Sequence, residues 1–369
     1  MKILITGAKG FVGKNLVAEL RNQGFSDLLE FDVDSNPELL DCFARECQFV
    51  FHLAGVNRPE RQEDFMKGNF GFTTELLDAL KKYNNKAPVL ISSSIQAALD
   101  NPYGQSKKAG EDLMFAYSKE TNAPVFVYRL PNVFGKWCRP NYNSAIATFC
   151  NNIANNLPIQ VNDPTVTMQL VYIDDVVASF IGKLKNSSNN TEIFEKATPV
   201  HEIRLGEIVD LLNAFKDSRE NLLLPNMNDA FTKKLYSTYL SYLPTDKFSY
   251  PLKMNVDERG SFTEFLKTKE RGQVSINISK PGITKGNHWH HTKNEKFLVV
   301  TGKGVIRFRK TDSTEIIEYF VSGEKLEVVD IPVGYTHNIE NLGDSDMVTV
   351  MWVNEIFDAQ RPDTYFLGV

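Results

Sequence analysis

The stretch Ile3-Leu4-Ile5-Thr6-Gly7-Ala8-Lys9-Gly10-Phe11-Val12-Gly13 opens the chain and decides the fold of its first part. Residues 3–5 have the composition of a buried strand, and residues 15–22 have the apolar spacing of a helix. Strand, glycine turn and helix form the setting of a dinucleotide site, because glycines let backbone N–H groups approach a pyrophosphate at the positive end of a helix. We therefore expect a nicotinamide cofactor to contact Gly7, Lys9, Gly10, Phe11, Val12 and Gly13.

Two charged residues near this turn point to different cofactors. A second strand is predicted at residues 28–32, and its last residue, Asp32, lies nineteen residues after Gly13. A carboxylate in that position can hold a ribose hydroxyl, which favours NAD. Lys9 inside the turn can instead meet a 2′-phosphate, which favours NADP. The residues alone leave this choice open.

A second polar stretch, Val89-Leu90-Ile91-Ser92-Ser93-Ser94, is followed by Asn101-Pro102-Tyr103-Gly104-Gln105-Ser106-Lys107. The first half predicts a buried parallel strand that ends at the serines, and Asn101 with Pro102 predicts the start of a helix. Tyr103 and Lys107 are four residues apart and share one face of that helix. An ammonium group favours the phenolate form of a tyrosine, whose pKa is ordinarily about 10. Hydride chemistry at a carbonyl is therefore predicted, with Tyr103 as the acid, Lys107 as its activating cation and a serine of this strand as a second hydroxyl donor.

Length and composition limit the class of protein. At 369 residues the chain exceeds what one core normally serves, so we expect two domains. The net charge of −5, with both signs interspersed, gives no basic surface for nucleic acid or for a membrane. The four cysteines form no C-x-x-C pair, and no apolar run approaches the roughly 18 residues of a membrane span. We expect a cytoplasmic protein with a small-molecule partner.

The sequence pattern changes from helical to alternating at about residue 253, which predicts an α/β domain at 1–248 and an all-β domain at 249–369. In the second part, His288 and His290 alternate with Trp289, so both imidazoles face one side of a strand. Glu295 and His337 can come from neighbouring strands of a barrel. Three imidazoles and a carboxylate suit Zn, Ni, Fe or Mn. The alternative is a metal-free barrel whose histidines hold a ligand.

Five separated motifs within residues 1–240 resemble, in order, those of extended short-chain dehydrogenases/reductases, a Rossmann-type doubly wound family. They are the G-x-x-G-x-x-G turn, residues 52–55 (His-Leu-Ala-Gly), the Ser94/Tyr103/Lys107 set, residues 129–135 and residues 169–176. The resemblance implies that Leu53, Ala54, Gly55 and Leu130 lie beside the cofactor, that Ser94 binds substrate, and that Tyr103 is the general acid/base with Lys107 as its partner. His52 is interpreted as a histidine with satisfied hydrogen bonds. Only eight residues separate Ser94 from Tyr103, so part of the usual substrate cover is expected to be missing.

The second part resembles the cupins, because both halves of their signature are present around His288, His290, Glu295 and His337. It departs from the signature at Leu326, where a glycine is usual. Residues 257–265 resemble the first strand of the dTDP-4-keto-6-deoxyhexose 3,5-epimerases, barrels that exchange a proton next to a ketone.

Taken whole, the chain resembles bifunctional reductase–cupin enzymes of capsular-polysaccharide synthesis. The resemblance implies C3 epimerisation of a UDP-linked 2-acetamido-2,6-dideoxy-4-hexulose by a jelly-roll zinc cupin. NADPH-dependent reduction at C4 then follows, toward UDP-N-acetyl-L-fucosamine, in a homodimer. Three alternatives stay open. The chain could be a single-site reductase–epimerase like GDP-fucose synthase with a structural cupin, a nicotinamide-binding redox sensor or scaffold, or a cupin dioxygenase coupled to a reductase.

Overall fold

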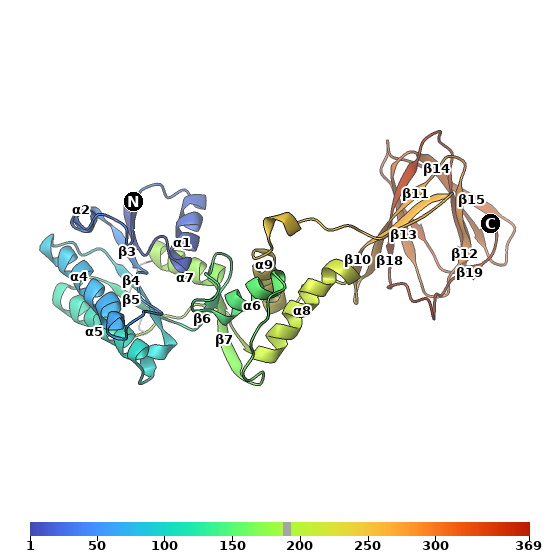
Figure 1. Ribbon diagram of the computed structural model, residues 1–369. Coiled ribbons are helices and arrows are strands. Elements are labelled where there is room, and N and C mark those ends of the chain that lie inside the picture. The colour runs from blue at the N-terminus through green and yellow to red at the C-terminus, as the bar shows by residue number, and fades with distance from the viewer. Residues whose placement is uncertain (187–192) are drawn as a thin grey trace. The chain divides into compact units, whose positions relative to one another are not determined.

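The computed structural model describes residues 1–186 and 193–369 (Figure 1). These residues divide into two compact units, one made of residues 1–212 and 230–244 and the other of residues 213–229 and 245–369. The division passes through α8 (Leu205–Asn221). The domain boundary that the sequence predicts, between residues 248 and 249, therefore stays a prediction.

A parallel sheet forms the centre of the first unit. Its strands are β1 (Ile3–Thr6), β2 (Leu28–Phe31), β3 (Phe49–His52), β4 (Val89–Ser94) and β5 (Val125–Leu130). They lie in the order β2-β1-β3-β4-β5, and all neighbours are parallel. The direction of the order reverses between β1 and β3, and in such sheets ligands bind beyond the carboxyl ends of the strands at this point. The glycine turn follows β1 and residues 53–55 follow β3, so both predicted cofactor segments lie there.

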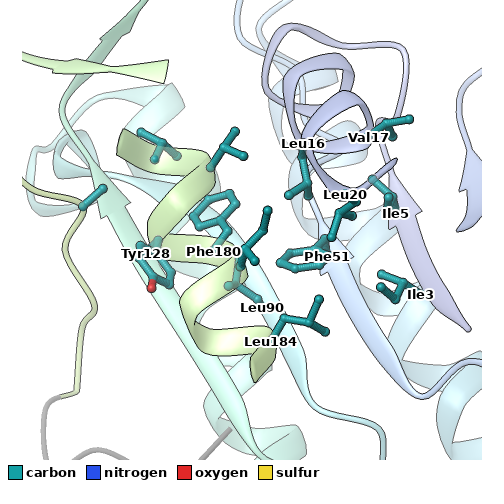
Figure 2. Close-up of a cluster of buried hydrophobic side chains, with 14 of the residues drawn as sticks. Ile3, Ile5, Leu16, Val17, Leu20, Phe51, Leu90, Tyr128, Phe180 and Leu184 are labelled. Carbon is teal, nitrogen blue, oxygen red and sulfur yellow. The ribbon is translucent and has the colours of Figure 1, made fainter. Parts of the chain in front are cut away.

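Helices cover both faces of this sheet, which confirms the predicted doubly wound fold. One cluster of buried side chains joins the sheet to α1 (Phe11–Asn22) and α7 (Ile173–Lys185), and a second joins it to α2 (Glu38–Glu46), α4 (Phe72–Lys82) and α5 (Pro102–Thr121). Because both faces are buried, the strands are continuously apolar. In the first cluster Phe180 of α7 packs between Phe51 and Tyr128, with ring centroids 6.1 and 4.8 Å away (Figure 2).

An irregular turn precedes helix α4. Residues Met66–Gly71 form a π-helical turn, η1, and α4 follows it. The Asn69 side chain holds this wider turn, because its Oδ1 accepts from Val56 N at 2.8 Å and its Nδ2 donates to Val56 O at 3.0 Å. Asn101 caps α5 as predicted, since its Oδ1 accepts from Gly104 N at 2.8 Å.

The remaining elements of the first part include a small sheet. Its strands are β6 (Asn132–Phe134), β7 (Thr167–Tyr172) and β8 (Val200–Arg204). The other helical segments of this unit are α3 (Glu63–Phe65), η2 (Ile95–Ala98), α6 (Ala145–Ala154) and α9 (Ala230–Leu240), whereas η3 (Thr245–Lys247) lies in the second unit. Among the described residues, no helix is both long and apolar enough to cross a membrane.

The second unit contains the predicted all-β structure, built from two antiparallel sheets. One sheet has the order β16-β13-β18-β11-β10-β9 and the other β15-β14-β17-β12-β19. The strands are β9 (Met254–Asp257), β10 (Gly260–Thr268), β11 (Gly272–Ser279), β12 (Thr284–Trp289), β13 (Glu295–Thr301), β14 (Lys303–Lys310), β15 (Ile316–Ser322), β16 (Val328–Ile331), β17 (Tyr335–Asn341), β18 (Met347–Val353) and β19 (Tyr365–Phe366). Phe297, Ile306 and Ile339 belong to the buried core of this unit.

Candidate active site and candidate metal centre

The glycine turn after β1 packs directly on the turn after β3. A Cβ atom placed on Gly7, whose φ is +71°, would lie 2.7 Å from Ala54 N, and one placed on Gly13 would lie 2.1 Å from Gly7 O. Helix α1 starts at Phe11, and its N-cap, Gly10, provides no side-chain hydrogen bond. The first N–H groups of α1 therefore lack a side-chain cap, as an anion-binding helix end requires. This cradle fits a nucleotide pyrophosphate.

Lys9 and Asp32 lie together at this end of the sheet. Lys9 N donates to Asp32 Oδ2 at 2.7 Å, and Val33 N donates to Asp32 Oδ1 at 2.8 Å. The Lys9 ammonium forms an exposed ion pair with Asp34 at 2.5 Å. The residue predicted to bind a ribose hydroxyl and the one predicted to bind a 2′-phosphate therefore lie side by side, and both roles stay predictions. Asp34 was not predicted, although it lies only two residues after Asp32.

The three predicted catalytic residues come from β4 and α5 and lie close together. Ser94 ends β4 and pairs in register with Leu130 of β5, and its hydroxyl is close enough to Tyr103 to lower the pKa of the phenol. Tyr103 lies in the first turn of α5, and the Lys107 Nζ is 5.9 Å from the centroid of its ring. Lys107 Nζ also donates to Ser92 O at 3.3 Å, which anchors the ammonium at the end of β4.

Burial dominates the pKa values at this site. It raises the pKa of Tyr103, an effect that the Ser94 hydroxyl opposes, and it lowers the pKa of Lys107 to about 8, which the Glu111 carboxylate opposes. The sequence predicted that Lys107 would favour the phenolate of Tyr103. In the protein alone the pKa of Tyr103 moves in the opposite direction, because removal from water disfavours the charged form of each group.

A buried ionic network that the sequence analysis missed lies behind the serine strand. The Glu111 carboxylate accepts hydrogen bonds from Arg129 Nε at 2.9 Å, from an Arg129 Nη atom at 2.6 Å and from Ser93 Oγ at 2.5 Å. Glu111 follows Lys107 by four residues, so the helical spacing already places it on the same face. The network links β4, α5 and β5 at the level of the candidate catalytic residues.

Two further polar residues are held within the same unit. Asn69 donates to Ser106 Oγ at 2.9 Å, and a Cβ atom on Gly55 would lie 2.9 Å from Asn69 Oδ1 and 3.0 Å from Lys107 Nζ. Gly55 therefore allows this turn to approach Lys107. His52 is buried and forms 2.8 Å hydrogen bonds with the hydroxyls of Thr6 and Thr73. The interpretation of His52 as a satisfied histidine is confirmed.

The four predicted metal ligands of the second unit converge. His288, His290, Glu295 and His337 each offer one ligand atom, and these atoms lie within 4.8 Å of one another. Glu295 Oε2 is 3.2 Å from His337 Nε2 and 3.6 Å from His290 Nε2. His288 comes from β12, Glu295 from β13 and His337 from β17, so the cluster joins both sheets.

The chemistry of this cluster fits a divalent cation. Four buried atoms of this cluster have no hydrogen-bond partner among the described residues, namely His290 Nε2, Glu295 Oε2 and both ring nitrogens of His337. Buried polar atoms without a partner are costly unless another group satisfies them. Burial lowers the pKa of His288 to about 4 and so keeps its imidazole in the neutral form that binds metals. Burial alone would raise the pKa of Glu295, but the neighbouring imidazoles of His290 and His337 lower it. Zinc suits this donor set.

The cluster forms part of the wall of a cavity of about 530 Å³ in the second unit. Asp257, Arg259 and Lys285 line the same cavity together with His288 and Glu295. None of the three was predicted as a site residue, although Asp257 and Arg259 lie in the stretch that resembles the 3,5-epimerases. The cavity therefore combines charged groups of both signs with the candidate metal ligands.

Comparison with known proteins identifies the family of each part of the chain. Residues 3–195 match the NAD dependent epimerase/dehydratase family, and residues 255–365 match the polysaccharide biosynthesis C-terminal domain. The chain is 45% identical to "UDP-2-acetamido-2,6-beta-L-arabino-hexul-4-ose reductase" of Pseudomonas aeruginosa over 100% of this chain and 99% of that protein.

Solved structures extend the comparison to both units. The capsular polysaccharide assembling protein CapF from Staphylococcus aureus is 59% identical, with a TM-score of 0.95 and 100% of each chain covered. A structure of CapF with the inhibitor 3-isopropenyl-tropolone is 55% identical, with a TM-score of 0.90 and the same coverage. The chain therefore belongs to the NAD dependent epimerase/dehydratase family, as a CapF-like member that continues into a polysaccharide biosynthesis C-terminal domain.

Proposed function

We propose that the chain is a bifunctional nucleotide-sugar enzyme of capsular-polysaccharide synthesis. It epimerises C3 of a UDP-linked 2-acetamido-2,6-dideoxy-4-hexulose in its second unit and reduces the C4 ketone in its first, toward UDP-N-acetyl-L-fucosamine. The observation that carries the reductase is the meeting of Ser94, Tyr103 and Lys107 at the carboxyl end of β4, in the same sheet as the glycine cradle. The full-length similarity to a UDP-sugar reductase supports the substrate class.

In the reduction, the nicotinamide cofactor supplies the hydride when it is bound. Tyr103 donates its phenolic proton to the C4 oxygen as the alcohol forms. Ser94, whose hydroxyl acts on the Tyr103 phenol, orients the same oxygen. Lys107, fixed by Ser92 O, stabilises the phenolate that remains. The glycine turn and residues 53–55 hold the nucleotide, and Leu130 lies next to Ser94 in the register of the sheet.

NADPH is the proposed cofactor. The Lys9 ammonium is exposed at the mouth of the glycine cradle, where a 2′-phosphate would compete with Asp34 for it. Both Asp32 oxygens already accept backbone N–H groups, which leaves the carboxylate less free to bind a ribose hydroxyl. A comparison of kcat/KM for NADPH and NADH tests the proposal, and a preference for NADH would favour the role of Asp32 instead.

The second unit is the proposed epimerase, a cupin with zinc at His288, His290, Glu295 and His337. A proton next to a ketone becomes acidic when the developing enolate is stabilised, and a bound divalent metal supplies Lewis acidity or structural support there. The protein's own contribution is the buried, converging ligand set inside a cavity large enough for a sugar.

One experiment tests both activities on the full chain. The protein is incubated with NADPH and the UDP-4-keto sugar in deuterated water, and NMR follows deuterium at C3 while absorbance follows NADPH. The His290→Ala variant should lose metal and C3 exchange, yet reduce a substrate that already has the required C3 configuration. Full exchange by this variant would favour a single-site enzyme like GDP-fucose synthase. Binding without turnover would favour a sensor, and iron with oxygen consumption would favour a dioxygenase.

We also expect a homodimer in the cytoplasm. Strand β15 and its neighbours expose several large apolar side chains that a second copy would cover, namely Ile316, Ile317, Phe320, Leu326 and Val328. Light scattering during gel filtration tests this expectation, and a monomeric mass at micromolar concentration would refute it.

A further inference from the structure

A bulge in β12 places Lys285 on the same face as His288. Side chains alternate along a regular strand, so residues three apart face opposite sides. In β12 the register against β17 shifts between Gly286 and His288, and Asn287 has no paired residue. One extra residue reverses the alternation. Both Lys285 and His288 accordingly line the cavity of the second unit.

The pairs across the bulge confirm this geometry. Lys285 pairs with Ile339, and His288 pairs with His337. Ile339 and His337 are two residues apart on β17, so they share a face, and both line the cavity. The bulge itself depends on positive φ angles of +107° at Gly286 and +60° at Asn287. A Cβ atom on Gly286 would lie 2.8 Å from His337 O, which explains the glycine.

Two fixed acceptors hold the Lys285 amine. Its Nζ donates to Asn277 Oδ1 at 2.9 Å and to Ile278 O at 2.8 Å. Asn277 is buried, and its Nδ2 lies 3.1 Å from Ser279 Oγ, which fixes the amide with its oxygen toward Lys285. Among the described residues, no carboxylate lies within ion-pair distance of Lys285, so its charge is not fixed by a partner.

This arrangement suits a group that gains and loses a proton. A neutral amine has two N–H groups, which the two acceptors occupy, and its lone pair then remains available. In the ammonium form a third N–H group takes the place of this lone pair. Burial lowers the pKa of Lys285, Asp257 opposes the shift and Arg259 adds to it. The other titratable groups that line the cavity are His288, Glu295 and His337.

We propose that Lys285 is the base that removes the C3 proton in the second unit. The proposal deepens the epimerase function proposed above and depends on it. The C3–H bond breaks and its proton joins the Lys285 lone pair. The electron pair of that bond forms the enolate, with its charge on the C4 oxygen. A solvent water returns a proton to the opposite face of C3, and the resulting hydroxide takes the proton from the ammonium.

Two substitutions distinguish a role of Lys285 as a base from a role as a fixed positive charge. Lys285→Ala removes both, whereas Lys285→Arg keeps a charge that does not deprotonate near neutral pH. Exchange of the C3 proton in deuterated water should fall on the order of 10²–10⁴-fold in each variant. Bound zinc, and reduction of a substrate with the required C3 configuration, should remain. The matched control is Lys303→Ala, because Lys303 is exposed on β14 of the same unit.

Rescue of the C3 exchange by an added amine is expected if Lys285 is the base, but not if Lys285 only supports the structure. Methylamine should restore part of the exchange in Lys285→Ala, increasingly as pH rises and more of the free amine is present. The proposal would be overturned if Lys285→Arg exchanged the C3 proton at the wild-type rate. It would also be overturned if methylamine did not rescue a Lys285→Ala protein that retains its zinc. If Lys285→Ala loses zinc, Lys285→Gln is measured in its place, and near wild-type exchange in that variant also overturns it. Absence of exchange in the wild-type protein would instead refute the epimerase function itself.

Discussion

The Nδ1 atom of His290 lies 2.6 Å from the backbone carbonyl oxygen of Asp363. A carbonyl only accepts, so the proton resides on Nδ1, and the lone pair of Nε2 faces the ligand cluster. Asp363 is itself fixed, because its carboxylate accepts from the backbone N–H groups of His291, Thr292 and Lys293 at 2.8–3.0 Å. Desolvation would raise the pKa of Asp363, but these hydrogen bonds lower it.

The first prediction concerns this support of His290. Asp363→Ala should free the segment that carries the carbonyl acceptor, so that His290 loses its orientation. Loss of such a partner typically weakens metal affinity about 10–100-fold. Competition with a chromogenic chelator measures the zinc affinity. Asp358→Ala is the control, because Asp358 accepts hydrogen bonds from Gln360 N and Arg361 N, its near neighbours in the same segment. Unchanged zinc affinity in Asp363→Ala would show that the His290 ring is held by packing alone.

The second prediction concerns Tyr103. Tyr103→Phe should remove reduction while leaving cofactor affinity nearly intact, because the phenol donates a proton in the transition state and does little to hold the nucleotide. General acid–base contributions are on the order of 10²–10⁴-fold. Single-turnover oxidation of NADPH measures the reduction, and fluorescence titration measures the affinity. Reduction near the wild-type rate would exclude Tyr103 from the mechanism.

The third prediction concerns the glycine cradle. Gly13→Ala should impair cofactor binding and folding, because the new Cβ atom would lie 2.1 Å from Gly7 O and 2.8 Å from Ala8 Cα. Gly182→Ala is a matched control, since Gly182 lies in α7 and, among the described residues, a Cβ atom added there would have no atom within 4 Å apart from its chain neighbours and the backbone of its own helix. In the control, helix propensity should raise the free energy of unfolding by up to about 1 kcal/mol. Denaturant unfolding and cofactor titration of both variants check the contrast, and equal cofactor affinities would contradict the close approach.

Periodicity in the sequence was enough to predict which residues share a face of a regular helix or strand. Tyr103 and Lys107 follow from helical spacing, and His288 and His290 follow from strand alternation. The same rule places Lys285 on the wrong face, because only the structure reveals the bulge at Gly286 and Asn287.

Properties that depend on tertiary surroundings could not be predicted. The direction of the pKa shift of Tyr103 depends on how much water the folded protein removes from the phenol, and spacing alone gives only its distance from Lys107. Asp363 lies 73 residues after His290, and no local pattern links them. The π-helical turn at Asn69 likewise depends on a hydrogen-bond partner thirteen residues away, Val56.

The last prediction concerns the acid stability that His52 controls. Burial lowers the pKa of His52 to about 3, with a smaller effect from the Lys107 charge. In the unfolded chain a histidine titrates near about 6.5. Between these values the unfolded chain binds more protons than the folded one, so the free energy of unfolding falls as pH decreases. Above pH about 6.5 the contribution of His52 is fully present and constant.

His52→Gln should isolate this effect, because glutamine can hydrogen-bond to Thr6 or Thr73 but does not titrate. The variant should be less stable than the wild type at pH 7, since the imidazole fills its site between the two hydroxyls. From pH 7 to pH 5 the wild type should lose about 2 kcal/mol more than the variant. Urea unfolding of both proteins at the two pH values measures the difference. Parallel pH dependence of the two proteins would show that His52 is protonated in the folded state, contrary to its buried position.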